Sequence, residues 1–233
     1  MTRSVIGLIL MICCTTAAAG DCVVLLHGLM RTATSMNKME RALDEAGYLT
    51  ANVSYPSRDY TVEELARMAV PQGLETCRAN GDVQRIHFVT HSLGGILLRQ
   101  YLSGNDIENL GRVVMLGPPN QGSVAVDELG GVPGFDWLNG PAGRQLGKGE
   151  ASVPLKLPPV DFELGIIAGN RTIDPITSAV LENPDDGRVS VEDTKVEGMD
   201  DIIVVEHSHA FMMRMRRPIE LTLRFLNQGS FSE

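Results

Sequence analysis

Aromatic side chains are scarce in this 233-residue chain, at 5% of the residues with a single tryptophan. That scarcity argues against a stacking platform for sugar rings or nucleic-acid bases. Positive charge is also in deficit, because 20 lysines and arginines face 29 aspartates and glutamates, which gives a formal net charge of −9. An acidic surface repels the phosphate backbone, so the composition excludes nucleic acid as the expected partner.

A hydrophobic run of membrane-spanning length is missing as well. The apolar run at residues 5–14 is shorter than the roughly 20 residues that a transmembrane helix needs. Arg3 precedes this run, and small residues ending at Ala19 follow it, which is the pattern of a secretory signal peptide. We therefore expect residues 1–19 to be removed, leaving residues 20–233 as a single exported domain, periplasmic or extracellular, with no stable transmembrane segment.

Cysteine is sparse, and its placement favours a structural role. Of the four cysteines, Cys13 and Cys14 belong to the predicted signal peptide, so only Cys22 and Cys77 remain in the mature chain. Two cysteines in an exported protein are expected to form a disulfide. The bridge would close a loop of more than fifty residues. A disulfide that closes such a loop stabilises the fold by about 4 kcal/mol if it is unstrained.

Metal and phosphate motifs are absent from the sequence. It contains no H-E-x-x-H segment, no cysteine cluster and no P-loop. We therefore expect no metal site and no cofactor.

Short apolar runs alternate with amphipathic stretches through the chain, which predicts a mostly parallel sheet with crossover helices, the α/β class. The expected strands are residues 23–26, 50–53, 86–89, 113–116, 164–168 and 202–205. The expected helices are residues 33–46, a helix from the capping box Thr61/Glu64 towards Cys77, a helix after Ser92, and residues 219–226. The Gly- and Pro-rich stretch at residues 122–160 predicts a cap insertion, and Phe135, Trp137 and Leu138 suggest a lid there.

Ser92 is the strongest candidate for chemistry, because it directly follows a predicted strand and precedes a predicted helix. A serine on such an elbow exposes its hydroxyl, and a glycine two residues later, here Gly94, leaves room for the helix to pack on the strand. Thr90 stands where the G-x-S-x-G pattern has its first glycine. The backbone N–H of Leu93, next to the nucleophile, is the expected donor to a developing oxyanion.

The segment His27-Gly28-Leu29 ends the first predicted strand and is the second candidate. Gly28 lets the backbone approach a substrate closely, and His27 supports the same turn. We expect the N–H of Leu29 to be the second oxyanion donor, with Met30 as the alternative.

An acid and a later histidine would complete a catalytic triad. Asp186 begins a turn after the strand at residues 164–168, with Asp185 as its rival. Of the two histidines after the last strand, His209 lies further into the loop and is favoured over His207. The three remaining histidines are expected to be structural, and His91 is expected to point away from the base: His27, His87 and His91.

Together these segments resemble the secreted lipase and esterase branch of the bacterial α/β-hydrolases. The resemblance covers nearly all of the mature chain and rests on residues 24–29, 90–95, 117–123, 186–190 and 207–209. It implies an α/β-hydrolase fold, a Ser92–Asp186–His209 triad with Leu29 and Leu93 as donors, no cofactor, and a small or lipid-like ester as substrate.

Two alternatives stay open at this point. The same triad serves acyl transfer and the cleavage of thioesters or amides, and a hydrolase fold also serves as a non-catalytic binding module of the cell envelope. The presence of Ser, Asp and His in the required order argues against the binding module. Nothing in the sequence indicates an oligomeric state.

Overall fold

Six parallel strands form a single sheet in the computed structural model, which describes residues 20–79, 81–129, 135–173 and 175–232. The strand order is β2-β1-β3-β4-β5-β6. Every neighbouring pair is parallel, so the prediction of a mostly parallel α/β sheet is confirmed. The strands are β1 (Gly20–Leu26), β2 (Leu49–Val53), β3 (Val83–His91), β4 (Leu110–Leu116), β5 (Leu164–Gly169) and β6 (Asp201–Val205). The predicted signal peptide, residues 1–19, lies outside the described residues.

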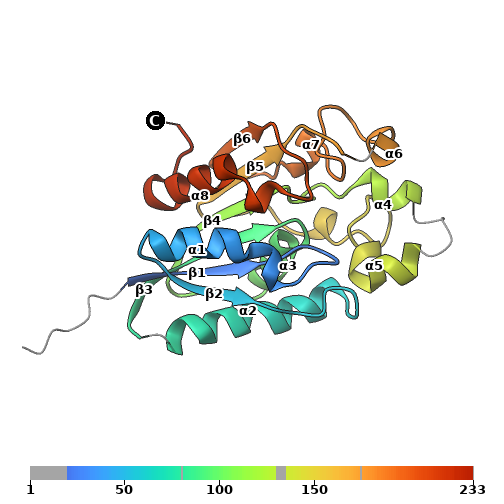
Figure 1. The fold of residues 1–233 in the computed structure, drawn as a ribbon. Coiled ribbons are helices and arrows are strands. Elements are labelled where there is room, and N and C mark those ends of the chain that lie inside the picture. The colour runs from blue at the N-terminus through green and yellow to red at the C-terminus, as the bar shows by residue number, and fades with distance from the viewer. Residues whose placement is uncertain (1–19, 80, 130–134, 174, 233) are drawn as a thin grey trace, which may run out of the picture.

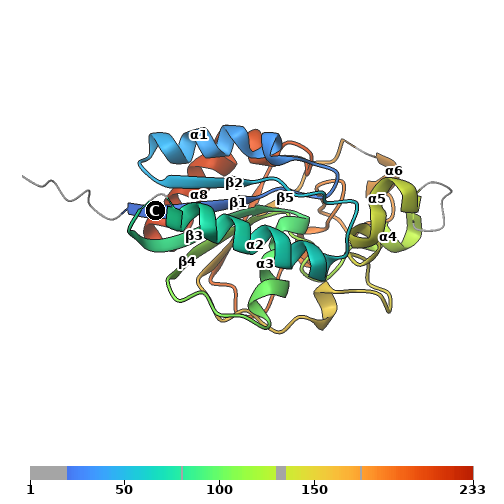
Figure 2. The same ribbon diagram turned by 90° about the horizontal axis from the view of Figure 1, so that it is seen from below.

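Helices cover both faces of this sheet, as Figure 2 shows. Alternate residues of β1 point to opposite faces, since side chains alternate along a strand. Val24 and Leu26 are buried in the core with α2 (Val62–Ala79) and α3 (Leu93–Leu102). Val23 and Leu25 belong to a second core with the helices of the other face, α1 (Asn37–Glu45) and α8 (Arg216–Gln228).

Local sequence signals account for several helix boundaries. The predicted capping box opens α2, because Thr61 N donates to Glu64 Oε2 over 2.9 Å and Glu64 N donates to Thr61 Oγ1 over 3.3 Å. The helix expected at residues 33–46 is a 3₁₀ turn, Ala33–Met36, followed by α1. Pro218 lies in the first turn of α8, where its missing N–H costs little.

The predicted disulfide is present between Cys22 in β1 and Cys77 in α2. The two Cα atoms are 5.8 Å apart, and both cysteines are fully buried. The bridge ties the start of the sheet to the end of the helix that covers it. Among the described helices, none combines the length and the apolar character needed to cross a membrane.

The stretch at residues 122–160 is less irregular than its composition suggests. It contains α4 (Val124–Leu129), α5 (Phe135–Arg144) and a 3₁₀ turn at Pro154–Lys156. Gly140, with φ of 66°, and Pro141 interrupt α5, which explains why no helical period is visible in the sequence. Figure 1 shows α4 and α5 beside the carboxyl end of the sheet. The side chains of the suggested lid residues Phe135, Trp137 and Leu138 lie outside the described part of the chain.

Three short elements complete the carboxyl-terminal half. They are α6 (Pro175–Ser178), α7 (Val191–Thr194) and a 3₁₀ turn at Met212–Arg214. The turns and loops between them follow β5 and β6. They bring the aspartate and histidine candidates to the carboxyl end of the sheet, where α/β folds bind ligands.

Candidate active site

Ser92 lies on a sharp turn between β3 and α3. Its φ of 53° and ψ of −120° are rare for a residue with a side chain, and they are held here by the strand on one side and the helix on the other. Gly94 makes the turn possible, because a Cβ at that position would lie 2.5 Å from the carbonyl oxygen of Leu26. Thr90 fits in place of the usual glycine because its neighbour across the turn, Gly95, has no side chain; a Cβ on Gly95 would lie 3.2 Å from Thr90 Oγ1.

His209 and Asp186 are joined by a hydrogen bond. His209 Nδ1 donates to Asp186 Oδ2 over 2.7 Å, and the carboxylate is buried. The other carboxylate oxygen, Oδ1, accepts the backbone N–H groups of Arg188 and Val189 over 2.9 and 2.8 Å. With Nδ1 as the donor, His209 Nε2 is left as the basic nitrogen of the ring.

The rival residues occupy different surroundings. The carboxylate of Asp185 accepts the N–H of Gly187 and the hydroxyl of Ser178, each over 2.7 Å. His207 is two residues closer to β6 and is not among the residues that line the cavity described next. The structure therefore brings Asp186 and His209 together, and it places Asp185 in the turn that supports them.

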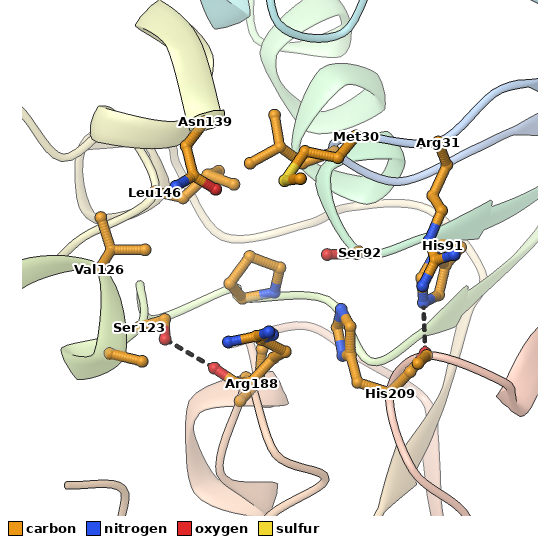
Figure 3. Close-up of a pocket in the computed structure, with 15 residues that line it drawn as sticks. Met30, Arg31, His91, Ser92, Ser123, Val126, Asn139, Leu146, Arg188 and His209 are labelled. Atoms are coloured by element: carbon orange, nitrogen blue, oxygen red, sulfur yellow. Dashed lines mark hydrogen bonds between the residues drawn. The ribbon is translucent and has the colours of Figure 1, made fainter. Parts of the chain in front are cut away.

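A cavity of about 490 Å³ opens between Ser92 and His209. Figure 3 shows the Ser92 hydroxyl and the His209 ring directed into it. Within the described residues no hydrogen bond joins Ser92 to His209; hydrogen bonds between catalytic groups often shorten only when a substrate binds. Fifteen residues line the cavity. They are Leu29, Met30 and Arg31 from the loop after β1, Ser123, Ala125, Val126, Asn139 and Leu146 from the 122–160 stretch, Pro119, His91, Arg188, Val189 and Ala210, and Ser92 and His209 themselves.

The backbone N–H groups of the loop after β1 differ in whether they already have a hydrogen-bond partner. Met30 N donates to Ser57 Oγ over 3.1 Å, so that group is already used. Leu29 N has no hydrogen-bond partner among the described residues, and Leu93 N opens α3 on the other side of Ser92. Gly28 allows the close approach, because a Cβ there would lie 2.7 Å from His91 Nδ1.

His27 holds the same loop from beneath. Its Nδ1 donates to the carbonyl of Gly28 over 2.9 Å, its ring stacks on Tyr55 at 3.8 Å, and the Tyr55 hydroxyl donates to the carbonyl of His27. Burial lowers the pKa of His27, so the ring is neutral and keeps this tautomer. Tyr55 and Ser57 were not singled out from the sequence; their place after β2, the strand beside β1, is the signal that could have found them.

His91 does not point away from the base, so that expectation is wrong. His91 Nε2 donates to the carbonyl oxygen of His209 over 3.0 Å, and the two ring centroids are 4.8 Å apart. Burial, and after it the electrostatic interaction with the neighbouring His209, lowers the pKa of His91 well below its usual value. His91 is thus a neutral donor that fixes the backbone of His209. The sequence could not show this, because His91 ends β3 whereas His209 lies in the loop after β6, more than a hundred residues later.

His87 is a satisfied core residue, as predicted. It is fully buried, its Nδ1 accepts the N–H of Arg112 over 2.7 Å, and its Nε2 lies 3.3 Å from Asp21 Oδ2. The described residues contain no group of three or more side chains able to hold a metal ion.

We compared the chain with known proteins by sequence and by structure. No protein-family model matches the chain, and no curated protein matches it in sequence. Solved structures do match. A lipase from Bacillus licheniformis in its mature form is 19% identical, with a TM-score of 0.73 over 91% of this chain and 93% of the lipase. An esterase from Pyrococcus furiosus is 16% identical, with a TM-score of 0.65 over 91% of this chain and 83% of the esterase.

A phospholipase from Legionella pneumophila is also similar, with 19% identity and a TM-score of 0.65 over 91% of this chain and 60% of that protein. These neighbours are a lipase, an esterase and a phospholipase. The protein therefore has the α/β-hydrolase fold.

Proposed function

We propose that this protein is an exported serine hydrolase that cleaves carboxylic esters through Ser92, His209 and Asp186. The observation that carries the proposal is the buried Asp186–His209 hydrogen bond of 2.7 Å, beside a serine on a strand–helix elbow that opens into the same cavity. Export rests on the predicted signal peptide and is supported by the disulfide, which persists in oxidising compartments.

Each residue has a role in the proposed reaction. His209 Nε2 takes the proton of the Ser92 hydroxyl as its oxygen attacks the ester carbonyl carbon. The N–H groups of Leu29 and Leu93 hold the negative oxygen of the tetrahedral intermediate. His209 then gives the proton to the leaving alcohol, and water, activated by the same nitrogen, releases the acid from the acyl-enzyme. Asp186 keeps Nδ1 protonated and stabilises the imidazolium.

The loop after β1, which carries Leu29, is held in place by several side chains, and this supports the proposed reaction. His27, Tyr55 and Ser57 hold the turn that carries Leu29, so the oxyanion donor is in place before substrate arrives. His91 holds the backbone of His209. A preorganised donor loses no energy to rearrangement during the reaction, which is the main source of catalysis in sites of this type.

The test is hydrolysis of p-nitrophenyl esters from acetate to palmitate by the mature protein and by Ser92→Ala. We expect activity with a chain-length optimum in the parent and at least about a 1,000-fold loss in the variant. Labelling of Ser92 by a fluorophosphonate provides a second readout. A folded protein that neither cleaves esters nor reacts with the probe would contradict the proposal and favour a binding module. Matched thioesters and acyl acceptors in the same assay distinguish ester hydrolysis from thioester cleavage and acyl transfer.

A further inference from the structure

The proposed triad comes from two separate parts of the fold. Ser92 belongs to the elbow after β3, whereas Asp186 and His209 form a pair in the loops that follow β5 and β6. The pair is linked twice, because His209 Nδ1 donates to Asp186 Oδ2 over 2.7 Å and His209 N donates to the carbonyl oxygen of Asp186 over 3.0 Å. These two bonds fix the base relative to the acid, but they fix neither residue relative to Ser92.

The side chain of His91 joins these two parts. His91 is the last residue of β3, directly before Ser92, and its Nε2 donates to the carbonyl oxygen of His209 over 3.0 Å, a bond drawn in Figure 3. Within the part of the chain that the structure describes, no other hydrogen bond runs from β3 or from Ser92 to Asp186 or His209. The hydrogen bond from His91 is therefore the direct link between the nucleophile and the pair.

We propose that His91 is a positioning residue of the reaction: it ties the Asp186–His209 pair to the strand that carries Ser92, and thereby sets the distance over which the proton moves from Ser92 Oγ to His209 Nε2. The inference rests on the proposed function of Ser92 and adds a residue to that same site. His91 acts through the backbone of His209 and exchanges no proton with the substrate.

The two ring nitrogens of His91 have different roles. A carbonyl oxygen only accepts hydrogen bonds, so Nε2 carries the proton and Nδ1 of the neutral ring has a lone pair. Nδ1 is buried and has no hydrogen-bond partner among the described residues. A second proton on the ring would be buried there without an acceptor, in agreement with the lowering of the pKa of His91 by burial. His91 therefore stays a neutral donor while His209 gains and loses its proton.

β3 supports this donor from inside the sheet. The strand lies between β1 and β4, and His91 is paired with Leu116 of β4. The N–H of Ser92 continues this pairing by donating to the carbonyl oxygen of Leu116 over 2.9 Å. The nucleophile and the side chain that holds the base thus share one hydrogen-bonded backbone segment.

Two glycines define the space around this arrangement. A Cβ on Gly28 would lie 2.7 Å from His91 Nδ1, so the loop after β1 packs directly on the ring. A Cβ on Gly117 would lie 3.0 Å from His209 Nδ1, so the Asp186–His209 pair packs directly on the end of β4. Packing at Gly117 limits how close the pair can come to the sheet, and the bond from His91 limits how far it can move away. A displacement of about 1 Å between reacting groups lowers a rate by up to about 100-fold.

Paired substitutions of His91 test the proposal. Glutamine keeps an N–H donor near the place of Nε2, whereas methionine has nearly the same length and shape but no such donor. We expect His91→Met to lower kcat for p-nitrophenyl esters by about 10- to 100-fold and to change KM by less than about threefold, because the lost bond affects the reaction and not the binding of substrate. His91→Gln should recover most of the loss.

Two further measurements distinguish positioning from a general loss of structure. In a His209→Ala background, the additional effect of His91→Met should vanish, since the residue through which His91 acts has lost its ring. In the single variant His91→Met, the downfield proton resonance of His209 Nδ1–H should remain, because the bond to Asp186 lies within the pair. His87→Met changes another buried histidine of β3 and is the matched control, with kcat expected to stay unchanged. The thermal midpoint shows whether each variant is folded.

A measurement on the parent protein needs no variant to fold. Nitrogen NMR with isotope-labelled histidines should show His91 as the neutral Nε2–H tautomer and His209 as the Nδ1–H tautomer. A neutral His91 with its proton on Nδ1 would overturn the inference, because its Nε2 could not donate to the carbonyl oxygen of His209.

Three results with the variants would also overturn the inference. They are a folded His91→Met protein as active as the parent, equal losses of kcat in His91→Met and His91→Gln, and a disappearance of the His209 Nδ1–H resonance together with the activity. In each case the parent still cleaves esters through Ser92, and the proposed function stands. Absence of both ester cleavage and fluorophosphonate labelling in the parent would instead contradict the proposed function itself.

Discussion

Two histidine–aspartate pairs lie at opposite ends of the same sheet. At the amino end, His87 Nε2 lies 3.3 Å from Asp21, and its Nδ1 accepts the N–H of Arg112. At the carboxyl end, His209 Nδ1 donates to Asp186 over 2.7 Å, and Nε2 has a cavity beside it. Both nitrogens of His87 are occupied within the core. An Asp–His pair can therefore transfer a proton to or from a substrate only when the ring nitrogen that does not contact the aspartate has no other hydrogen-bond partner.

The two ends of the sheet also differ in their packing and backbone strain. The amino end is closed by the disulfide and by the Asp21–Arg85 ion pair, and its contacts serve stability. The carboxyl end holds exposed arginines, an open cavity and strained backbone. Catalytic sites commonly hold such locally unfavourable features, which the rest of the fold compensates.

The largest effect is expected when one aspartate of each pair is replaced. Asp186→Asn is expected to lower kcat by about 10,000-fold, because an amide no longer holds the Nδ1–H tautomer of His209 or stabilises its charged form. Asp21→Asn, the matched control, should leave kcat within about twofold, because His87 takes no part in the reaction. Ester hydrolysis under substrate saturation measures both. Equal losses in the two variants would refute the distinction between the pairs.

A smaller effect is expected from pH. Burial lowers the pKa of His87, His27 and His91 relative to the usual value of 6.5, so each is neutral in the folded protein. In the unfolded chain they take up protons as the pH falls below 6.5. Their contribution to stability is therefore complete above pH 6.5 and is lost as the pH falls from 6.5 to each lowered pKa, by up to about 1.4 kcal/mol per pH unit for each histidine.

Urea unfolding of the Ser92→Ala protein between pH 8 and pH 5 measures this slope without involving catalysis. His87→Gln should reduce the slope, since it removes one of the groups that must stay neutral. A free energy of unfolding that is constant over this range would contradict the assignment of neutral buried histidines.

The smallest expected effect concerns backbone strain. Met30 and Ser92 are the described non-glycine residues with positive φ, at 58° and 53°, and both line the cavity. Met30→Gly should raise the free energy of unfolding by about 0.5–1 kcal/mol, because relief of the left-handed conformation exceeds the added freedom of the unfolded chain. The thermal midpoint measures the change. Met30→Ala keeps the strain and is the control; a glycine variant less stable than the alanine variant would refute the argument.

The sequence predicted the sheet well because its strands contain short continuous apolar runs, which are typical of parallel strands buried on both faces. The capping box at Thr61 and Glu64, and the cysteines left after the predicted signal peptide, are local or countable signals, and the structure contains both the capped helix and the disulfide. The helices of the 122–160 stretch were not predicted, since glycine and proline break their period. Whether that stretch acts as a cap over the cavity stays a prediction.

Within the site, the sequence was enough to show which segments carry polar residues after the strands, and so to predict that Ser92, the Asp185–Asp186 pair and the His207/His209 pair lie at one edge of the sheet. Three contacts could be found only in the folded protein: Asp186 accepts a hydrogen bond from His209, Ser57 accepts the N–H of Met30, and His91 holds the backbone of His209. The physical reason is that neighbouring residues in a loop share the same local pattern. Which of them reaches a partner depends on how loops from separate strands pack together, and that information is spread over residues far apart in the chain.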